Sequence, residues 1–149
     1  MLFRSSSLDK KKQDRVSVRE ELVVLRAYLF LLEARFEDAL VVKININERH
    51  MDSLIPQFTL QLLVENCIKH NIVSLEEPLQ VNVYSDQSYI IVENNLQPKR
   101  SPEPSTGTGL NNIAERYITS LHAEIDIIKD DKFFRVKLPV KYEDIDVKK

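Results

Sequence analysis

Apolar residues recur along the first half of the chain with two different periods, which predict helices alternating with strands. A capping box at Ser17 and Glu20 opens a run in which Leu or Phe recurs every three or four residues up to Phe36, the pattern of a helix. Residues 40–47 alternate between apolar and polar side chains, as a strand does. Pro56 suits the first turn of a second helix, which we expect to reach about Asn71.

The second half of the chain repeats this alternation in a different order. The patterns predict, in sequence, two strands joined by a polar turn, a proline-rich loop, a third helix and a two-stranded hairpin. These segments are Leu79 to Tyr84, Tyr89 to Asn94, residues 96–106, residues 110–121, Ala123 to Ile128 and Phe133 to Leu138.

The order of elements predicts the fold class. Helices interleaved with hairpins favour an α+β fold, a two-layer α/β sandwich in which a mixed sheet of about five strands is covered on one face by about three helices. We expect one domain over residues 16–140, a polar tail or stub over residues 1–15 and a charged tail over residues 141–149.

The composition excludes some classes of function for this chain. A net charge of −2 gives no electrostatic case for nucleic acid, and no apolar run approaches the ~18 residues that span a bilayer. The single cysteine, Cys67, cannot form an internal disulfide, which fits a reducing cytoplasm. Only two glycines are present, Gly107 and Gly109, so the segment that holds both is expected to need backbone freedom or close approach to a ligand.

The second predicted helix carries an unusual group of polar side chains. Glu65, Asn66, Lys69 and His70 lie on the half of the helical wheel that also carries apolar Leu62. Such a face resembles one wall of a half-apolar pocket, and a carboxylate, an amide and an ammonium suit a polyphosphate bound to a metal ion. A Glu and a Lys four residues apart are also a common surface pair, so this segment alone does not establish a site.

Two further segments carry candidate chemistry. Asn94 and Asn95 end a predicted strand, where they could bind a ligand or simply close the strand. The segment Gly107-Thr108-Gly109-Leu110-Asn111 leads into a helix, where free backbone N–H groups can bind phosphate.

Together the three segments resemble, in this order, the N box and the first and second glycine boxes of the Bergerat-fold (GHKL) ATPases, and most closely the C-terminal ATP-binding domain of LytS-type sensor histidine kinases. The resemblance implies that the chain binds ATP and Mg²⁺, with Asn66 as the Mg²⁺ ligand, Lys69 on phosphate and Glu65 orienting or deprotonating the attacking group. It implies a nucleotide site made of Asn66, Lys69, His70, Asn94, Asn95, Gly107, Thr108, Gly109, Leu110 and Asn111.

The chain departs from the family pattern at two positions of the first glycine box. Asn94 stands where the family has an Asp that accepts the adenine amino group, and Leu96 stands in place of a glycine. An amide oxygen can still accept a hydrogen bond, but as a neutral partner it makes a weaker one. In the proline-rich loop, Lys99 and Arg100 could approach phosphate or be merely solvated.

The family phrase that carries the acceptor histidine, Asn-Pro-His-Phe-Leu-Phe-Asn, does not occur in this sequence. We therefore expect a catalytic fragment whose acceptor lies on an upstream region that forms a homodimer. The expected partners are ATP and a response regulator, and the expected location is the cytoplasmic side of a bacterial inner-membrane sensor. Two alternatives stay open: a degenerate, non-catalytic Bergerat-fold interaction module, and a Bergerat-fold protein-serine kinase.

Overall fold

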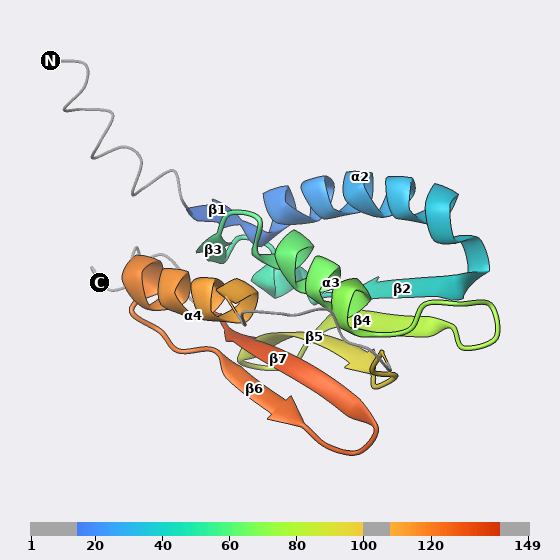
Figure 1. Cartoon of the computed structure of the whole chain (residues 1–149). Helices are drawn as coiled ribbons and strands as arrows, with labels where there is room; N and C mark the ends of the chain where they lie inside the picture. The colour runs from blue at the N-terminus through green and yellow to red at the C-terminus, as the bar shows by residue number, and fades with distance from the viewer. Residues whose placement is uncertain (1–14, 100–107, 141–149) are drawn as a thin grey trace, which may run out of the picture.

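The computed structural model describes residues 15–99 and 108–140, which form a mixed sheet with helices on one of its faces (Figure 1). The three α-helices are α2 (Val18–Phe36), α3 (Thr59–His70) and α4 (Thr108–Leu121), and two short 3-10 helices are η1 (Glu37–Ala39) and η2 (Glu48–His50). The main sheet contains β2 (Leu40–Asn45), β4 (Leu79–Ser85), β5 (Tyr89–Asn95), β6 (Asp126–Lys129) and β7 (Phe133–Pro139), and a separate pair contains β1 (Arg15–Ser17) and β3 (Leu54–Pro56). The predicted α+β sandwich is confirmed.

The sheet has the strand order β2-β4-β5-β7-β6. Only β2 and β4 are parallel, and the other neighbours are antiparallel, so the sheet is mixed as expected. Alternate residues of β4, namely Leu79, Val81 and Val83, are fully buried. They pack in one core with the inward leucines of α2 and α3, because side chains two apart on a strand share a face.

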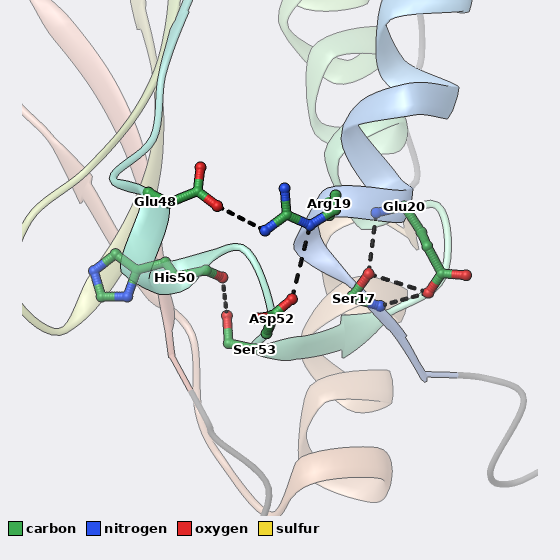
Figure 2. Close-up of polar contacts among 7 residues, drawn as sticks. All are labelled: Ser17, Arg19, Glu20, Glu48, His50, Asp52 and Ser53. Atoms are coloured by element: carbon green, nitrogen blue, oxygen red, sulfur yellow. Dashed lines mark hydrogen bonds and ion pairs between the residues drawn. The ribbon is translucent and has the colours of Figure 1, made fainter.

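Helix α2 begins where the capping box predicts. The Ser17 hydroxyl accepts from the Glu20 N–H at 3.1 Å, and the Glu20 carboxylate accepts from the Ser17 N–H at 3.1 Å. Figure 2 shows this box beside Arg19, whose guanidinium lies 2.7 Å from the Glu48 carboxylate and 3.7 Å from that of Asp52. These ion pairs are exposed and contribute little to stability, so the cap and the core fix the start of the helix.

The predicted start of the second helix is wrong. Pro56 ends strand β3, which pairs with β1, and α3 begins only at Thr59. Between them Phe58 adopts a left-handed backbone conformation with φ of 68°, which turns the chain from strand to helix. The short β1–β3 pair has no periodic signal of its own in the sequence. The first predicted strand also ends earlier, at Asn45 instead of Asn47, and Asn47 caps the 3-10 helix η2.

A buried carboxylate from α2 supplies the N-terminal cap of α3. Glu21 is 1% exposed, and its two carboxylate oxygens accept from the backbone N–H groups of Phe58 at 3.0 Å and Leu60 at 2.9 Å. From α4, Arg116 donates to the carbonyl oxygen of Gln57 at 2.6 Å. Side chains of α2 and α4 thus hold the backbone just before and within the first turn of α3.

No helix in residues 15–99 and 108–140 is both long and apolar enough to span a membrane. The predicted tails cover residues 1–15 and 141–149. Residues 1–14 and 141–149 lie outside the described residues, whereas Arg15 begins strand β1, and the proposed domain limits stay predictions.

Candidate functional site

A cavity of about 420 Å³ opens where α3, the end of β5 and the start of α4 come together. Its walls combine polar groups with apolar side chains. The lining residues are Asn66, Cys67, Lys69, His70, Asn71, Asn94, Leu96, Pro98, Lys99, Gly109, Leu110, Lys129 and Phe134. All three sequence segments singled out as candidate chemistry therefore contribute to one cavity.

Helix α3 supplies the polar wall. Asn66, Lys69 and His70 are three and four residues apart, so the helix presents them on one side. Partial burial, with smaller effects from the charges of Lys69 and Lys99, lowers the pKa of His70 below its ordinary value. His70 is consequently neutral near pH 7 and can both donate and accept hydrogen bonds, while Lys69 supplies the positive charge.

Gly109 brings the start of α4 against Asn66. A Cβ atom placed on Gly109 would lie 3.8 Å from the Asn66 Oδ1 atom, so glycine leaves the space beside that oxygen open. An amide oxygen at the edge of a cavity, next to free helix-terminal N–H groups and a lysine, is a donor set suited to Mg²⁺ and phosphate. The residues that the structure describes contain no cluster of three or more His, Cys, Asp or Glu side chains suited to a metal, so a metal here would rely on few protein ligands.

The orientation of the Asn94 amide is fixed by its neighbour. Asn94 is 1% exposed, and its Nδ2 donates to the carbonyl oxygen of Asn95 at 2.8 Å. A carbonyl can only accept, so the amide nitrogen must face it, and Oδ1 remains as the acceptor on the other side. Phe134 pairs with Asn94 across β5 and β7 and adds an aromatic face to the cavity, while Leu96 adds an aliphatic one. This end of the cavity suits a flat ring that carries an amino group.

Hydrogen bonds that the sequence did not indicate connect the end of α3 with the loop after β5. The Asn71 amide donates to the Cys67 carbonyl oxygen at 2.9 Å and accepts from the Gln97 N–H at 2.8 Å. Gln97 in turn donates from its side chain to the carbonyl oxygens of Ile72 and Glu77. Because the three hydrogen bonds of Gln97 join residues 20 to 26 positions apart, no local pattern could have indicated them.

Cys67 lines the cavity, but its thiol is unreactive at neutral pH. It is 6% exposed, and burial raises the pKa of its thiol to about 12. The thiol is therefore protonated at neutral pH and cannot serve as a nucleophile. This agrees with its expected role as a small core residue.

Several of the candidate residues lie outside this cavity. Glu65 instead lines a second cavity, which shares Asn66 with the first. Asn95 instead stabilises the strand end, where its side chain accepts from the Gln80 N–H at 2.8 Å, and Asn111 is exposed and lines neither cavity. Thr108 begins α4, and Gly107 and Arg100 lie outside the described residues, so their expected roles stay predictions.

Restoring the acid of the family pattern at position 94 is expected to destabilise this chain. In Asn94→Asp a carboxylate oxygen replaces Nδ2 against the Asn95 carbonyl, so a hydrogen bond becomes a repulsion in a buried place. We expect a loss of about 2 kcal/mol in the free energy of unfolding, growing as pH rises, because burial disfavours the ionised form. Urea unfolding at pH 5 and pH 8 measures this.

The matched control is Asn82→Asp on the neighbouring strand β4, where the side chain is only half-buried and a change of about 0.5 kcal/mol is expected. Equal stability of Asn94→Asp and the native chain at both pH values would contradict the assigned orientation of the Asn94 amide.

Comparison with known proteins places the chain in a family. No family model matches it. The sensor histidine kinase/phosphatase LytS of Staphylococcus aureus strains Mu50 and NCTC 8325 is 32% identical over 122 residues, which cover 72% of this chain and 21% of LytS. The chain thus spans about a fifth of the length of these curated relatives.

Solved structures support the same fold at low sequence identity. The catalytic domain of histidine kinase ThkA matches with a TM-score of 0.56 at 12% identity, covering 84% of this chain and 97% of that domain. Histidine kinase AdeS of Acinetobacter baumannii matches with a TM-score of 0.53 at 16% identity, covering 93% of this chain and 75% of that one. By its fold and by its similarity to LytS, the chain belongs to the family of sensor histidine kinase catalytic domains.

Proposed function

We propose that this chain binds Mg²⁺ and ATP in the cavity of about 420 Å³ and transfers the γ-phosphoryl group of ATP to a histidine. One observation carries the proposal: three sequence segments meet in one cavity whose lining is both polar and apolar. The segments are represented by Asn66 and Lys69, by Asn94, and by Gly109.

Each group of lining residues has a role in this proposal. Asn66 holds Mg²⁺, which neutralises phosphate charge, and Lys69 and the N–H groups at the start of α4 bind phosphate oxygens. Asn94 Oδ1 accepts from the adenine amino group, and Phe134 and Leu96 pack against the ring. His70, neutral at pH 7, hydrogen-bonds near the phosphates. By the family resemblance, Gly107 and Thr108 are proposed to contribute to the same phosphate site, and Gly107 lies outside the described residues.

Nucleotide binding is tested by isothermal titration of the whole chain with non-hydrolysable ATP and GTP analogues in the presence of Mg²⁺. We expect heat with the ATP analogue and at least about tenfold weaker binding of the GTP analogue, because guanine presents a carbonyl oxygen to Asn94 Oδ1 where adenine presents a donor. Equal binding of both analogues, or no heat with either, would contradict the proposed site.

The acceptor histidine and the partners belong to the same proposal. Since the sequence lacks the family's acceptor phrase, the acceptor is expected on an upstream dimer-forming region, with a response regulator as the next recipient and the cytoplasm as the location. LytS is much longer than this chain, which supports looking for the acceptor outside these residues.

A second candidate function is a non-catalytic interaction module, and two observations favour it. A neutral amide replaces the family's acid at Asn94, and the side chain of Leu96 occupies part of the cavity wall where the family has glycine. Supplying the acceptor region of a LytS-type kinase in trans with labelled ATP separates the two functions. Acid-labile phosphohistidine on the acceptor supports the kinase, whereas nucleotide binding without any transfer supports the module.

A further inference from the structure

Helix α2 carries apolar side chains on two opposite faces. Its inner face packs in the core, whereas three large apolar side chains of its outer face are largely exposed: Val23 at 68%, Phe30 at 73% and Leu31 at 66%. A helix at the surface of a globular protein normally has a polar outer face, so this pattern indicates a partner. We call the exposed apolar residues of this helix the outer stripe. They are Val23, Val24, Ala27, Phe30, Leu31 and Ala34.

The outer stripe is uncovered within residues 15–99 and 108–140. In that part of the chain, α2 packs against α3, β1, β2 and η1. Figure 1 shows α2 along the upper edge of the molecule, with α3 and β2 below it. No residue of the outer stripe lines either of the two cavities described above, so the stripe is separate from the proposed nucleotide site.

The spacing of the outer stripe is that of a seam between two helices. Val23, Ala27, Phe30 and Ala34 follow one another at intervals of four, three and four residues, as the a and d positions of a heptad do. Large and small side chains alternate along this seam. Two copies of it fit together when the helices run antiparallel, because Phe30 of one copy then lies opposite Ala27 of the other, and the next layer sets Val23 opposite Ala34. In a parallel pair, each residue would instead meet its own copy, so that large side chains would crowd one layer and alanines would leave gaps in the next.

The residues beside the seam favour the same antiparallel arrangement. Arg26 and Glu33 are exposed on one flank of the seam, and Val24 and Leu31 lie on the other. In the antiparallel register, Arg26 lies opposite Glu33 of the second copy, and twofold symmetry forms the reciprocal pair. On the other flank, Val24 lies opposite Leu31 of the second copy. The outer stripe and its flanks are therefore complementary to themselves in shape, in charge and in apolar surface.

We propose that the outer stripe of α2 binds the outer stripe of a second copy of this chain, with the two helices antiparallel about a twofold axis. A second copy is the occupant because one sequence supplies both charges and both sizes of side chain at matching distances from the axis. An interface of one helix from each copy is small, below the ~1,200 Å² of a standard contact, so we expect a weak dimer with a dissociation constant on the order of 100 μM. This contact joins two catalytic domains directly, in addition to the upstream dimer-forming region that the sequence led us to expect.

The first test measures the mass of the whole chain by sedimentation equilibrium, at concentrations from about tenfold below to about tenfold above this dissociation constant. We expect the mass of one chain at the lowest concentration and a mass approaching that of two chains at the highest. Phe30→Glu puts a charge at the centre of the seam and is expected to raise the dissociation constant at least about tenfold.

The matched control for this substitution is Ile118→Glu. Ile118 is 50% exposed on α4 and lies outside the outer stripe and both cavities, so this variant should dimerise like the native chain. A native chain that stays monomeric at every concentration, or equal dissociation constants for Phe30→Glu and Ile118→Glu, would overturn the proposal.

The second test identifies the direction of the two helices by reversing charges. Arg26→Glu alone sets two acidic side chains opposite each other, and Glu33→Arg alone sets two basic ones opposite each other. Each single variant is expected to raise the dissociation constant about fivefold. The double variant restores both pairs of opposite charge and is expected to return the dissociation constant to within about twofold of the native value. Single reversals without effect, or a double variant that dimerises no more tightly than the singles, would overturn the antiparallel arrangement.

Two further measurements separate this contact from folding and from the nucleotide site. The substituted side chains are exposed, so each variant should have the urea midpoint of the native chain at the lowest concentration. Binding of the Mg²⁺-bound ATP analogue should also be unchanged, because the outer stripe lines neither cavity. If a different protein or another segment of this chain covers the stripe, the chain stays monomeric or its dimer is insensitive to Phe30→Glu, and either result overturns the proposal.

Discussion

Replacing Asn66 with Ala is expected to weaken binding of a Mg²⁺-bound ATP analogue about 100-fold, or about 2.7 kcal/mol. Asn66 lies on α3 with its Oδ1 close to Gly109 at the start of α4, and it lines both cavities. Without the amide, the metal loses its protein oxygen ligand and the phosphates lose the charge that the metal supplies. Isothermal titration with and without Mg²⁺ measures the effect.

The Mg²⁺ dependence makes this prediction specific. In the native chain, removing Mg²⁺ is expected to weaken nucleotide binding strongly, whereas in Asn66→Ala the same removal should change binding by no more than about twofold. Asn45→Ala, which removes an exposed amide at the end of β2, is the matched control and should bind like the native chain. If Asn66→Ala binds as tightly as that control, Asn66 is not the metal ligand.

Replacing Glu21 with Ala is expected to lower the free energy of unfolding by about 3 kcal/mol, a large share of the stability of a small domain. The change leaves the N–H groups of Phe58 and Leu60 without their acceptor at the buried start of α3. It also removes a negative charge from the positive end of the helix dipole. Urea unfolding followed by circular dichroism measures the loss. Glu33→Ala, exposed on the same helix, should cost only about 0.5 kcal/mol.

The Glu21 effect should depend on pH with a defined sign. Burial raises the pKa of Glu21 above the value of 4.5 expected in the unfolded chain, and this outweighs the hydrogen bonds that favour the ionised form. The folded state therefore binds the proton more tightly, and its stability falls as pH rises from about 4.5 through the raised pKa. The difference between the native chain and Glu21→Ala should be largest in acid and level off above that pKa. A difference that grows with pH would contradict burial as the dominant cause.

Local patterns in the sequence were sufficient for most elements. The capping box at Ser17 and Glu20 set the start of α2, and alternation of apolar residues set β4 and β5 to within one residue. These features depend on neighbours one to four positions apart, so the sequence alone contains the information. Pro56 was misassigned because proline suits both the first turn of a helix and the end of an edge strand.

The candidate site likewise has residues that the sequence identified and contacts that only the structure shows. The sequence identified Asn66, Lys69, Asn94 and Gly109 by residue type and order, and the structure brings them to one cavity. It did not indicate the hydrogen bond that the Gln97 N–H, in the loop after β5, donates to the Asn71 side chain, because the two residues are 26 positions apart.

What the sequence determined by itself is thus the identity of the elements and the kind of chemistry that their ends carry, since propensity, periodicity and capping act over a few residues. Only the tertiary structure decided that Glu65 and Lys69, one helical turn apart, face different surroundings, with Glu65 lining the second cavity and Lys69 lining both. The reason is physical: which side of a helix meets which neighbour depends on the packing of α2 and α4 against α3, and that packing is fixed by contacts such as Glu21 with Leu60 that join residues far apart in the chain.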